Sequence, residues 1–166
     1  MSAKVGDSIP DTNLFDLDEA GAPRAAPASE RLRSKRVAVF AVPGAFTRTC
    51  SEKHLPGFVE HADAIRAAGV DEIACVSVND PMVMAAWGRA HGADDKIAML
   101  ADGLAEFTRA MGMDQDMSAR GYGVRSKRYA MLVNDGRIED LQVEPPGEYG
   151  VSSAEAMLER LRATRG

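Results

Sequence analysis

The chain of 166 residues is 45% hydrophobic and 27% charged, a balance typical of a soluble globular protein with one domain spanning residues 1–166. Its formal net charge of −5 argues against nucleic acid or an anionic membrane surface as the main partner. No stretch approaches the ~20 apolar residues that a membrane-spanning helix needs.

The first part of the chain is expected to contain short elements before one buried strand. Alternation, turn residues and a helix-capping serine predict an extended arm at 1–12, a short strand at 14–17, a turn at 19–23, a short helix at 29–34 capped by Ser29, and a strand at 37–42. Residues 22–28 are too rich in alanine and proline for an assignment. The 37–42 run is apolar throughout, so we expect it to be buried on both faces of a sheet.

The middle of the chain is expected to alternate helices and buried strands. A helix should begin near Cys50 and continue to about Gly69, with a kink where Pro56 and Gly57 interrupt it. The pattern then predicts a strand at 73–78, a helix at 81–90 capped by Asn79 or Asp80, a strand at 97–100, and a helix over 104–111 capped by Asp102.

The last part of the chain is expected to complete the sheet. Polar residues 114–123 predict a loop or a short turn of helix, and strands at 128–133 and 138–143 flank the hairpin signal Asn134-Asp135-Gly136. A capping box, Ser152-Ser153-Ala154-Glu155, begins the final helix. The order β-α-β-α-β-α-β-β-α predicts an α/β fold with a central mixed sheet and helices on both faces.

The stretch from Val42 to Ser51 carries the strongest chemical signal. The buried strand ends at Pro43, which rigidifies the following loop, and Cys50 stands where a helix begins. Unpaired amide N–H groups and the positive end of the helix dipole favour the thiolate there. Thr47, three residues earlier, can place a hydroxyl beside the same sulfur. Spacing alone leaves open whether Cys50 is reactive or buried and inert.

The pattern Pro43-x-x-x-Thr47-x-x-Cys50 resembles the active-site signature of the peroxiredoxins, which are thiol peroxidases of thioredoxin-like fold. The longer run Pro-Gly-Ala-Phe-Thr-x-Thr-Cys-Ser, with His54-Leu55-Pro56-Gly57-Phe58 behind it, is similar to the atypical type II subfamily of plants and bacteria. Similar segments follow in order along nearly the whole chain, at 77–81, 100–103, 125–129 and 151–155.

The resemblance implies an enzyme that reduces hydrogen peroxide and alkyl hydroperoxides without a metal or organic cofactor. It implies Cys50 as the nucleophile, Thr47 as the hydrogen-bonding positioner, Pro43 as the pocket wall, and Gly44, Phe46 and Thr49 as substrate contacts. It also implies a homodimer that packs loops near the active site together.

In-line thiolate attack on a peroxide also needs a fixed positive charge, and Ser51 and Glu52 bring none. In the family that this chain resembles, the positive charge comes from an arginine at the start of the strand before the hairpin. Arg128 occupies that position. Arg125 and Lys127 are interpreted as solvated basic residues. Arg48 stands where the family usually has proline, which predicts a more mobile and more positive loop.

A sulfenic acid at Cys50 must be returned to the thiol by another thiol. Cys75 is the internal candidate for a resolving cysteine, but it lies in an apolar run that favours burial in a strand. The better hypothesis is an external reductant, either glutathione with glutaredoxin, as the resemblance implies, or thioredoxin. Two cysteines in a chain of this size and no signal-peptide layout at the N-terminus predict a cytoplasmic location.

Two alternatives use the same cysteine. One is a redox-sensing or chaperone-like protein whose oxidation state is read by partners. The other is a cysteine hydrolase built on Cys50 and His54, four residues later on the same helix. A zinc site would need further ligands, and His61 and His91 have no metal-like spacing, so no metal is expected.

Overall fold

The apolar run that follows Arg36 forms β3 (Arg36–Val42), an inner strand of a seven-stranded mixed sheet in the computed structural model, which describes residues 2–93 and 95–165. The strand order in the sheet is β2 (Pro23–Pro27), β1 (Asn13–Leu17), β5 (Ala98–Ala101), β4 (Glu72–Ser77), β3, β8 (Tyr129–Asn134) and β9 (Arg137–Val143). Strands β3, β4 and β5 are parallel, and the remaining pairs are antiparallel.

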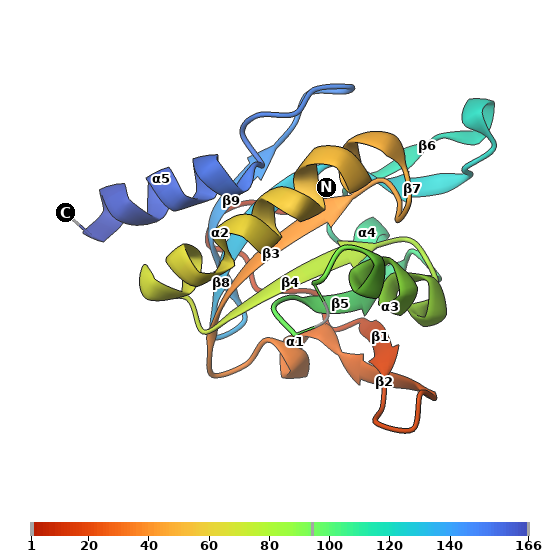
Figure 1. The fold of residues 1–166 in the computed structure, drawn as a ribbon, viewed down its shortest axis with the longest axis horizontal. Coiled ribbons are helices and arrows are strands. Elements are labelled where there is room, and N and C mark those ends of the chain that lie inside the picture. The colour runs from red at the N-terminus through yellow and green to blue at the C-terminus, as the bar shows by residue number, and fades with distance from the viewer. Residues whose placement is uncertain (1, 94, 166) are drawn as a thin grey trace.

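Helices cover both faces of this sheet, which confirms the predicted α/β architecture (Figure 1). One face packs against α2 (Leu55–Ala67), α3 (Pro81–Ala90) and α5 (Ala154–Arg165). The other face packs against α1 (Ala28–Arg31), α4 (Glu106–Ala110) and the N-terminal arm. Alternate residues of β3 enter the two cores, so the strand is buried on both faces, as its composition predicts.

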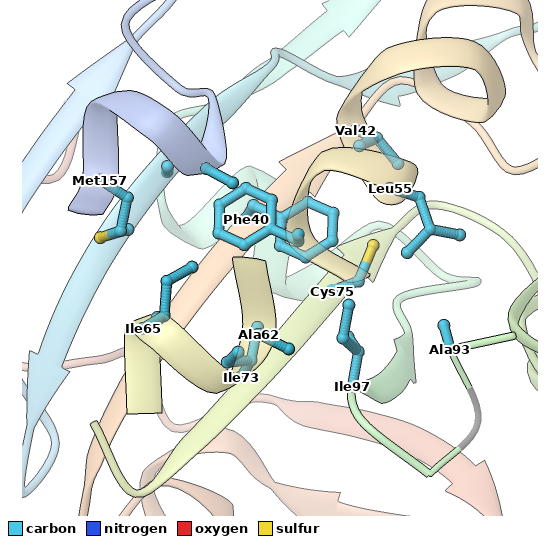
Figure 2. Close-up of a cluster of buried hydrophobic side chains, with 14 of the residues drawn as sticks. Phe40, Val42, Leu55, Ala62, Ile65, Ile73, Cys75, Ala93, Ile97 and Met157 are labelled. Carbon is cyan, nitrogen blue, oxygen red and sulfur yellow. The ribbon is translucent and has the colours of Figure 1, made fainter. Parts of the chain in front are cut away.

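The core under α2 is the side of the sheet that carries both cysteines. Phe40 of β3 stacks on Phe58 of α2 with ring centroids 4.0 Å apart. Figure 2 shows the Cys75 sulfur in this cluster, near Phe40 and Leu55, and the whole Cys75 residue is inaccessible to solvent. The predicted burial of Cys75 in a strand is therefore confirmed.

The loops that follow the parallel strands gather at one edge of the sheet. The Ala45 N–H donates to Asn79 Oδ1 over 2.9 Å, which ties the loop after β3 to the loop after β4. Asp102 follows β5 and donates its own N–H to the Ser77 carbonyl at 2.8 Å. In open α/β sheets the carboxyl ends of the strands are where sites form, and Cys50 lies at this edge.

Two short antiparallel pairs were not anticipated. The segment 22–28, whose alanine- and proline-rich composition permits no assignment, contains the edge strand β2, whose prolines stand at its two ends, where a strand tolerates them. Residues 114–123, predicted as a loop or a short turn of helix, contain a 3₁₀ turn at Ser118–Arg120, but they also contribute β6 (Asp114–Asp116) to a two-stranded ribbon with β7 (Val124–Ser126), which was not predicted.

Three local predictions need correction. The helix expected at 29–34 is the shorter α1, and the Ser29 hydroxyl does not cap it but donates to Asp11 Oδ1 at 2.5 Å. The capping box does not form on Ser152: Ser153 caps α5 by accepting the Ala156 N–H, since Ser152 is used elsewhere. Asp102 accepts two amide N–H groups of α4, although the residue at the helix N-cap is Ala105.

Other predicted elements agree to within one or two residues. Asp80 caps α3 by accepting the Val83 N–H, with Pro81 at the first helical position. The hairpin turns at Asp135-Gly136, where both residues have positive φ, as a type I′ turn requires. None of the described helices is both long and apolar enough to cross a bilayer.

Candidate active site

The helix that carries Cys50 begins with a wide turn. The Thr47 carbonyl accepts the Ser51 N–H at 2.9 Å, so Cys50 belongs to the first helical turn, as predicted. Cys50–His54 then form a π-turn, in which the Leu55 N–H donates to the Cys50 carbonyl. Pro56 has no N–H for a regular helical bond, yet α2 continues through Pro56 and Gly57, and the irregularity of the helix lies before them, in this π-turn.

Arg128 contacts the Cys50 sulfur from a different part of the chain. Its Nη2 donates to Cys50 Sγ over 3.2 Å, although 78 positions separate the two residues. The antiparallel register that pairs Ala41 with Tyr129 brings the start of β8 beside the end of β3 and explains this proximity. A guanidinium group at this distance stabilises a thiolate by charge and by hydrogen bonding.

His54 holds the second branch of the Arg128 guanidinium. The Arg128 Nη1 donates to His54 Nδ1 at 2.8 Å, and His54 Nε2 donates to the Ser152 carbonyl at 2.9 Å. This pairing requires the neutral ring with its proton on Nε2. Burial first, and then the charge of Arg128, lower the pKa of His54 to about 3.

The hydrolase alternative is disfavoured by the same contacts. Both ring nitrogens of His54 are committed, one to Arg128 and one to Ser152. A neutral His54 with its basic nitrogen occupied by a guanidinium cannot remove a proton from Cys50. His54 is instead a positioning residue for Arg128.

A buried carboxylate supports His54 from behind. Glu144 Oε2 accepts the Ser152 N–H at 2.9 Å, the Ser152 hydroxyl at 2.7 Å and the Gly150 N–H at 2.6 Å. Despite the opposing effect of desolvation, these donors lower the pKa of Glu144 below its ordinary value. The Glu144 N–H also donates to the Arg128 carbonyl. The hydrogen bonds therefore form a closed ring, from Arg128 to His54, to Ser152, to Glu144 and back to Arg128.

Tyr149 covers the outer side of this network. Its ring lies 5.9 Å from the Arg128 guanidinium carbon and 5.3 Å from the His54 ring, edge to face with the latter. The Tyr149 hydroxyl donates to the Lys53 carbonyl at 3.4 Å. Burial raises the pKa of Tyr149 to about 12, so the ring stays neutral beside the guanidinium.

The loop before Cys50 is shaped by its own hydrogen bonds. The Thr47 hydroxyl donates to the Gly44 carbonyl at 2.6 Å, and the Thr47 N–H donates to the same oxygen at 3.3 Å. Phe46, between them, has φ of +64°, a left-handed conformation that is costly for an aromatic residue. The Thr47 hydrogen is therefore engaged, and its oxygen keeps lone pairs that can accept a hydrogen bond.

The other predicted substrate contacts differ in their exposure. Gly44 is buried, Pro43 and Thr49 are half-buried, and Phe46 is 56% exposed. The roles assigned to them through the resemblance stay predictions. Arg48 is exposed and pairs with Glu52 one helical turn later.

The interpretation of Arg125 as a solvated residue is wrong. Its Nη1 donates to the Pro43 carbonyl at 3.2 Å, and its Nε donates to the Tyr122 carbonyl at 2.9 Å. The error follows from the missed β6–β7 ribbon, because only that ribbon brings Arg125 to the loop.

Sequence reasoning also missed the contributions of Glu144, Ser152 and Tyr149. Glu144 precedes two prolines, and Ser152 lies near a helix start. Both positions have common structural explanations, and neither indicates that the two side chains form a buried pair. The i,i+4 spacing of Cys50 and His54 points to His54 alone and not to the three residues behind it.

Cys75 stays apart from this network. Both cysteines are free thiols, and Cys75 is in the middle of β4 opposite Phe40 and Met99 of the neighbouring strands. Burial raises the pKa of Cys75 well above that of a free thiol. Within residues 2–93 and 95–165, no group of three or more His, Cys, Asp or Glu side chains is placed to hold a metal ion.

The chain is similar to a described protein family and to named proteins. Residues 4–158 match the family model described as Redoxin. Peroxiredoxin-2B of Arabidopsis thaliana is 44% identical over 157 residues, which cover 95% of this chain and 97% of that protein. Peroxiredoxin sll1621 of Synechocystis is 52% identical over 116 residues, which cover 70% of this chain and 60% of that protein.

A solved structure shares the same fold. The structure of reduced Prx3 from Vibrio vulnificus in complex with hydrogen peroxide has a TM-score of 0.92 and 47% identity, covering 96% of this chain and 99% of that one. The oxidised form of the same protein has a TM-score of 0.88.

Proposed function

Because the chain belongs to the Redoxin family and is a peroxiredoxin, a thiol-dependent peroxidase, we propose that it reduces hydrogen peroxide and alkyl hydroperoxides at Cys50 and is recycled by glutathione with glutaredoxin. The observation that carries the assignment of Cys50 is the 3.2 Å hydrogen bond from Arg128 to its sulfur. The Vibrio vulnificus relative, described as a complex of the reduced protein with hydrogen peroxide, supports the choice of substrate.

The chemistry at Cys50 is a two-electron transfer. The Cys50 thiolate attacks the terminal oxygen of the hydroperoxide, an S–O bond forms, and the O–O bond breaks. The departing alkoxide or hydroxide takes up a proton and leaves as alcohol or water, while the sulfur becomes a sulfenic acid. Arg128 is positioned to stabilise the negative charge that passes from sulfur to the leaving oxygen.

Thr47 is suited to hold the incoming peroxide. Since its hydroxyl hydrogen is given to the Gly44 carbonyl, its oxygen is free to accept the O–H of the hydroperoxide. Arg128 then supplies donors, and Thr47 supplies an acceptor. This division of roles would orient the O–O bond along the line of attack.

The reductant is proposed from the burial of both sulfurs. Cys50 has no exposed surface, which favours a small thiol over the thiol of a protein, because less of the surroundings has to move. One glutathione displaces water from the sulfenic acid and forms a mixed disulfide, and a glutaredoxin thiol then reduces that disulfide. Cys75 is buried in the sheet, and a disulfide to Cys50 would require rearrangement of a strand or a helix.

The test replaces Cys75 and varies the reductant. Cys75→Ser is expected to keep turnover with glutathione and glutaredoxin within about twofold of the wild type, since an external thiol resolves the sulfenic acid. We expect thioredoxin alone to support slower turnover in both proteins. Steady-state peroxide consumption with each reductant measures this.

Loss of glutathione-supported turnover in Cys75→Ser, in a protein that unfolds at the same temperature as the wild type, would make Cys75 the resolving cysteine. Faster turnover with thioredoxin than with glutathione and glutaredoxin would replace the proposed reductant.

We also propose that the chain forms a homodimer through the loops beside the active site. The large apolar side chains Phe46, Met82 and Leu104 are 56%, 49% and 62% exposed. Phe46 and Leu104 lie in loops, and Met82 lies in the first turn of α3. These segments adjoin, because the Ala45 N–H donates to Asn79 and the space beside Gly103 is bounded by the Asn79 carbonyl. Exposed apolar side chains gathered on adjoining segments are a common feature of protein interfaces.

A negative charge placed on the surface formed by Phe46, Met82 and Leu104 is expected to separate the protomers. Phe46→Asp and Leu104→Asp should each shift the mass measured by light scattering from dimer towards monomer. Val5→Asp is the matched control, because Val5 is 57% exposed but lies beside β9 near the hairpin turn, at the opposite edge of the sheet. A monomeric wild type, or a dimer that survives both changes, would contradict the proposal.

We propose that the enzyme acts in a reducing compartment, the cytoplasm. The two cysteines are free thiols, and the reaction begins from a reduced Cys50. Fractionation of cells that express the full-length protein, with detection in the cytoplasmic fraction, tests this location.

A further inference from the structure

The geometry points to Arg125 as a positioning residue for peroxide reduction, which acts through the Pro43–Gly44 peptide and Thr47 rather than on the sulfur. Arg128 is the arginine that touches Cys50. Arg125 contacts the opposite end of the same loop at the Pro43 carbonyl, one residue before the Gly44 carbonyl that accepts the Thr47 hydroxyl.

Arg125 is itself held from two sides. Its Nε donates to the Tyr122 carbonyl at 2.9 Å, and its guanidinium carbon lies 5.4 Å from the centroid of the Tyr122 ring. Its Nη1 donates to the Pro43 carbonyl at 3.2 Å. Figure 1 shows the β6–β7 ribbon extending beyond the main sheet on the side where the loop enters α2. A planar guanidinium group held by these contacts has little freedom to move away from the loop.

The absence of a side chain at Gly44 makes this contact feasible. A Cβ atom on Gly44 would lie 2.5 Å from Arg125 Nη1, which is closer than such atoms approach. The φ angle of Gly44 is not in the left-handed region. Glycine is therefore required here for the close approach of Arg125 and not for its conformational freedom.

The contact is transmitted to the reacting groups through one peptide and one carbonyl. In a trans peptide the Pro43 carbonyl and the Gly44 N–H point in opposite directions, so the bond from Arg125 orients the whole plane. The next carbonyl, that of Gly44, lies in the following peptide plane, whose Ala45 N–H donates to Asn79 Oδ1 at 2.9 Å, and it accepts the Thr47 hydroxyl at 2.6 Å. Arg125 holds the first of these two planes and Asn79 holds the second, and together they set the direction in which the Thr47 oxygen offers its lone pairs to a hydroperoxide.

The test is the rate of the first chemical step in Arg125→Ala. We expect the second-order rate constant of the reduced enzyme with hydrogen peroxide to fall about tenfold, because a misplaced Thr47 weakens the hydrogen bond that it accepts from the peroxide. The ultraviolet absorbance of the Cys50 thiolate as a function of pH should not change, since Arg128 still contacts the sulfur. Arg125→Lys should recover part of the rate through one remaining donor.

Lys127→Ala is the matched control. It removes the same charge two residues away, and the Lys127 backbone bond to the Met113 carbonyl is kept. Its rate constant should stay within about twofold of the wild type. An equal loss in Lys127→Ala and Arg125→Ala would mean that only the general positive field matters, and the inference would be overturned.

A second variant tests the contact between Arg125 and the loop without removing the arginine. A Cβ on Gly44 would lie 2.5 Å from Arg125 Nη1 and 3.1 Å from Thr47 Cγ2, so Gly44→Ala displaces Arg125, also crowds Thr47, and should slow the reaction at least as much as Arg125→Ala. Because Gly44→Ala already breaks the Arg125 contact, the double variant should be no slower than Gly44→Ala alone. Losses that multiply, a thiolate absorbance that shifts with the rate, or an Arg125→Ala rate equal to the wild type would each refute the inference.

Discussion

Cys50→Ser is expected to abolish peroxide consumption with every reductant. A serine hydroxyl is not ionised at neutral pH, and it cannot accept the oxygen atom that a thiolate takes from a hydroperoxide. We expect the rate to fall to that of the uncatalysed reaction. Peroxide consumption, together with mass spectrometry of the protein after one equivalent of peroxide, measures the effect.

The other cysteine is the control for this change. Wild type and Cys75→Ser should each gain one oxygen atom at Cys50, or one glutathione in a mixed disulfide where glutathione is added, whereas Cys50→Ser should remain unmodified. Turnover that persists in Cys50→Ser, or an oxygen atom found on Cys75, would show that the reaction proceeds at another sulfur.

Arg128→Met is expected to slow the reaction with peroxide by about 100-fold or more. A hydrogen bond to a charged group contributes about 1.5–3 kcal/mol, which corresponds to roughly 10- to 150-fold, and the charge on the leaving oxygen adds to this. Stopped-flow measurement with the reduced protein gives the rate constant. The thiolate absorbance at a given pH should decrease in parallel, in contrast to Arg125→Ala.

Arg128→Lys distinguishes charge from geometry. A lysine keeps the positive charge, but one ammonium group on a flexible stem cannot reproduce the planar fork that bonds both Cys50 and His54. We therefore expect a rate between those of Arg128→Met and the wild type. A wild-type rate in Arg128→Met would remove the guanidinium from the mechanism.

The network behind Arg128 explains how the guanidinium keeps its direction. His54 stays neutral because of its burial and the adjacent guanidinium charge, and a neutral ring can accept the second branch of Arg128. Glu144 and Ser152 then fix the carbonyl that receives the other ring nitrogen. Supporting groups of this kind hold a charged side chain in one geometry before the reaction begins. Little free energy of reorganisation is then needed in the transition state.

Elements marked by local chemistry were predicted well. The Asn134-Asp135-Gly136 turn, the Asp80-Pro81 helix start and the apolar run of β3 each depend on backbone preferences of a few neighbouring residues. Strands β2, β6 and β7 carry few apolar residues, and their pairing depends on a partner strand rather than on their own propensity. Those were the strands that sequence reasoning missed.

The sequence by itself determined the α/β fold, the nucleophile at the helix start and, through a resemblance, the identity of the partner arginine. The tertiary structure alone decided that Arg128 meets the sulfur with one branch and His54 with the other, and that Arg125 holds the loop. These contacts join residues that are 74 to 82 positions apart. Local propensities act over a few residues, whereas contacts across such separations are set by the register of β8 on β3 and by the path of the β6–β7 ribbon.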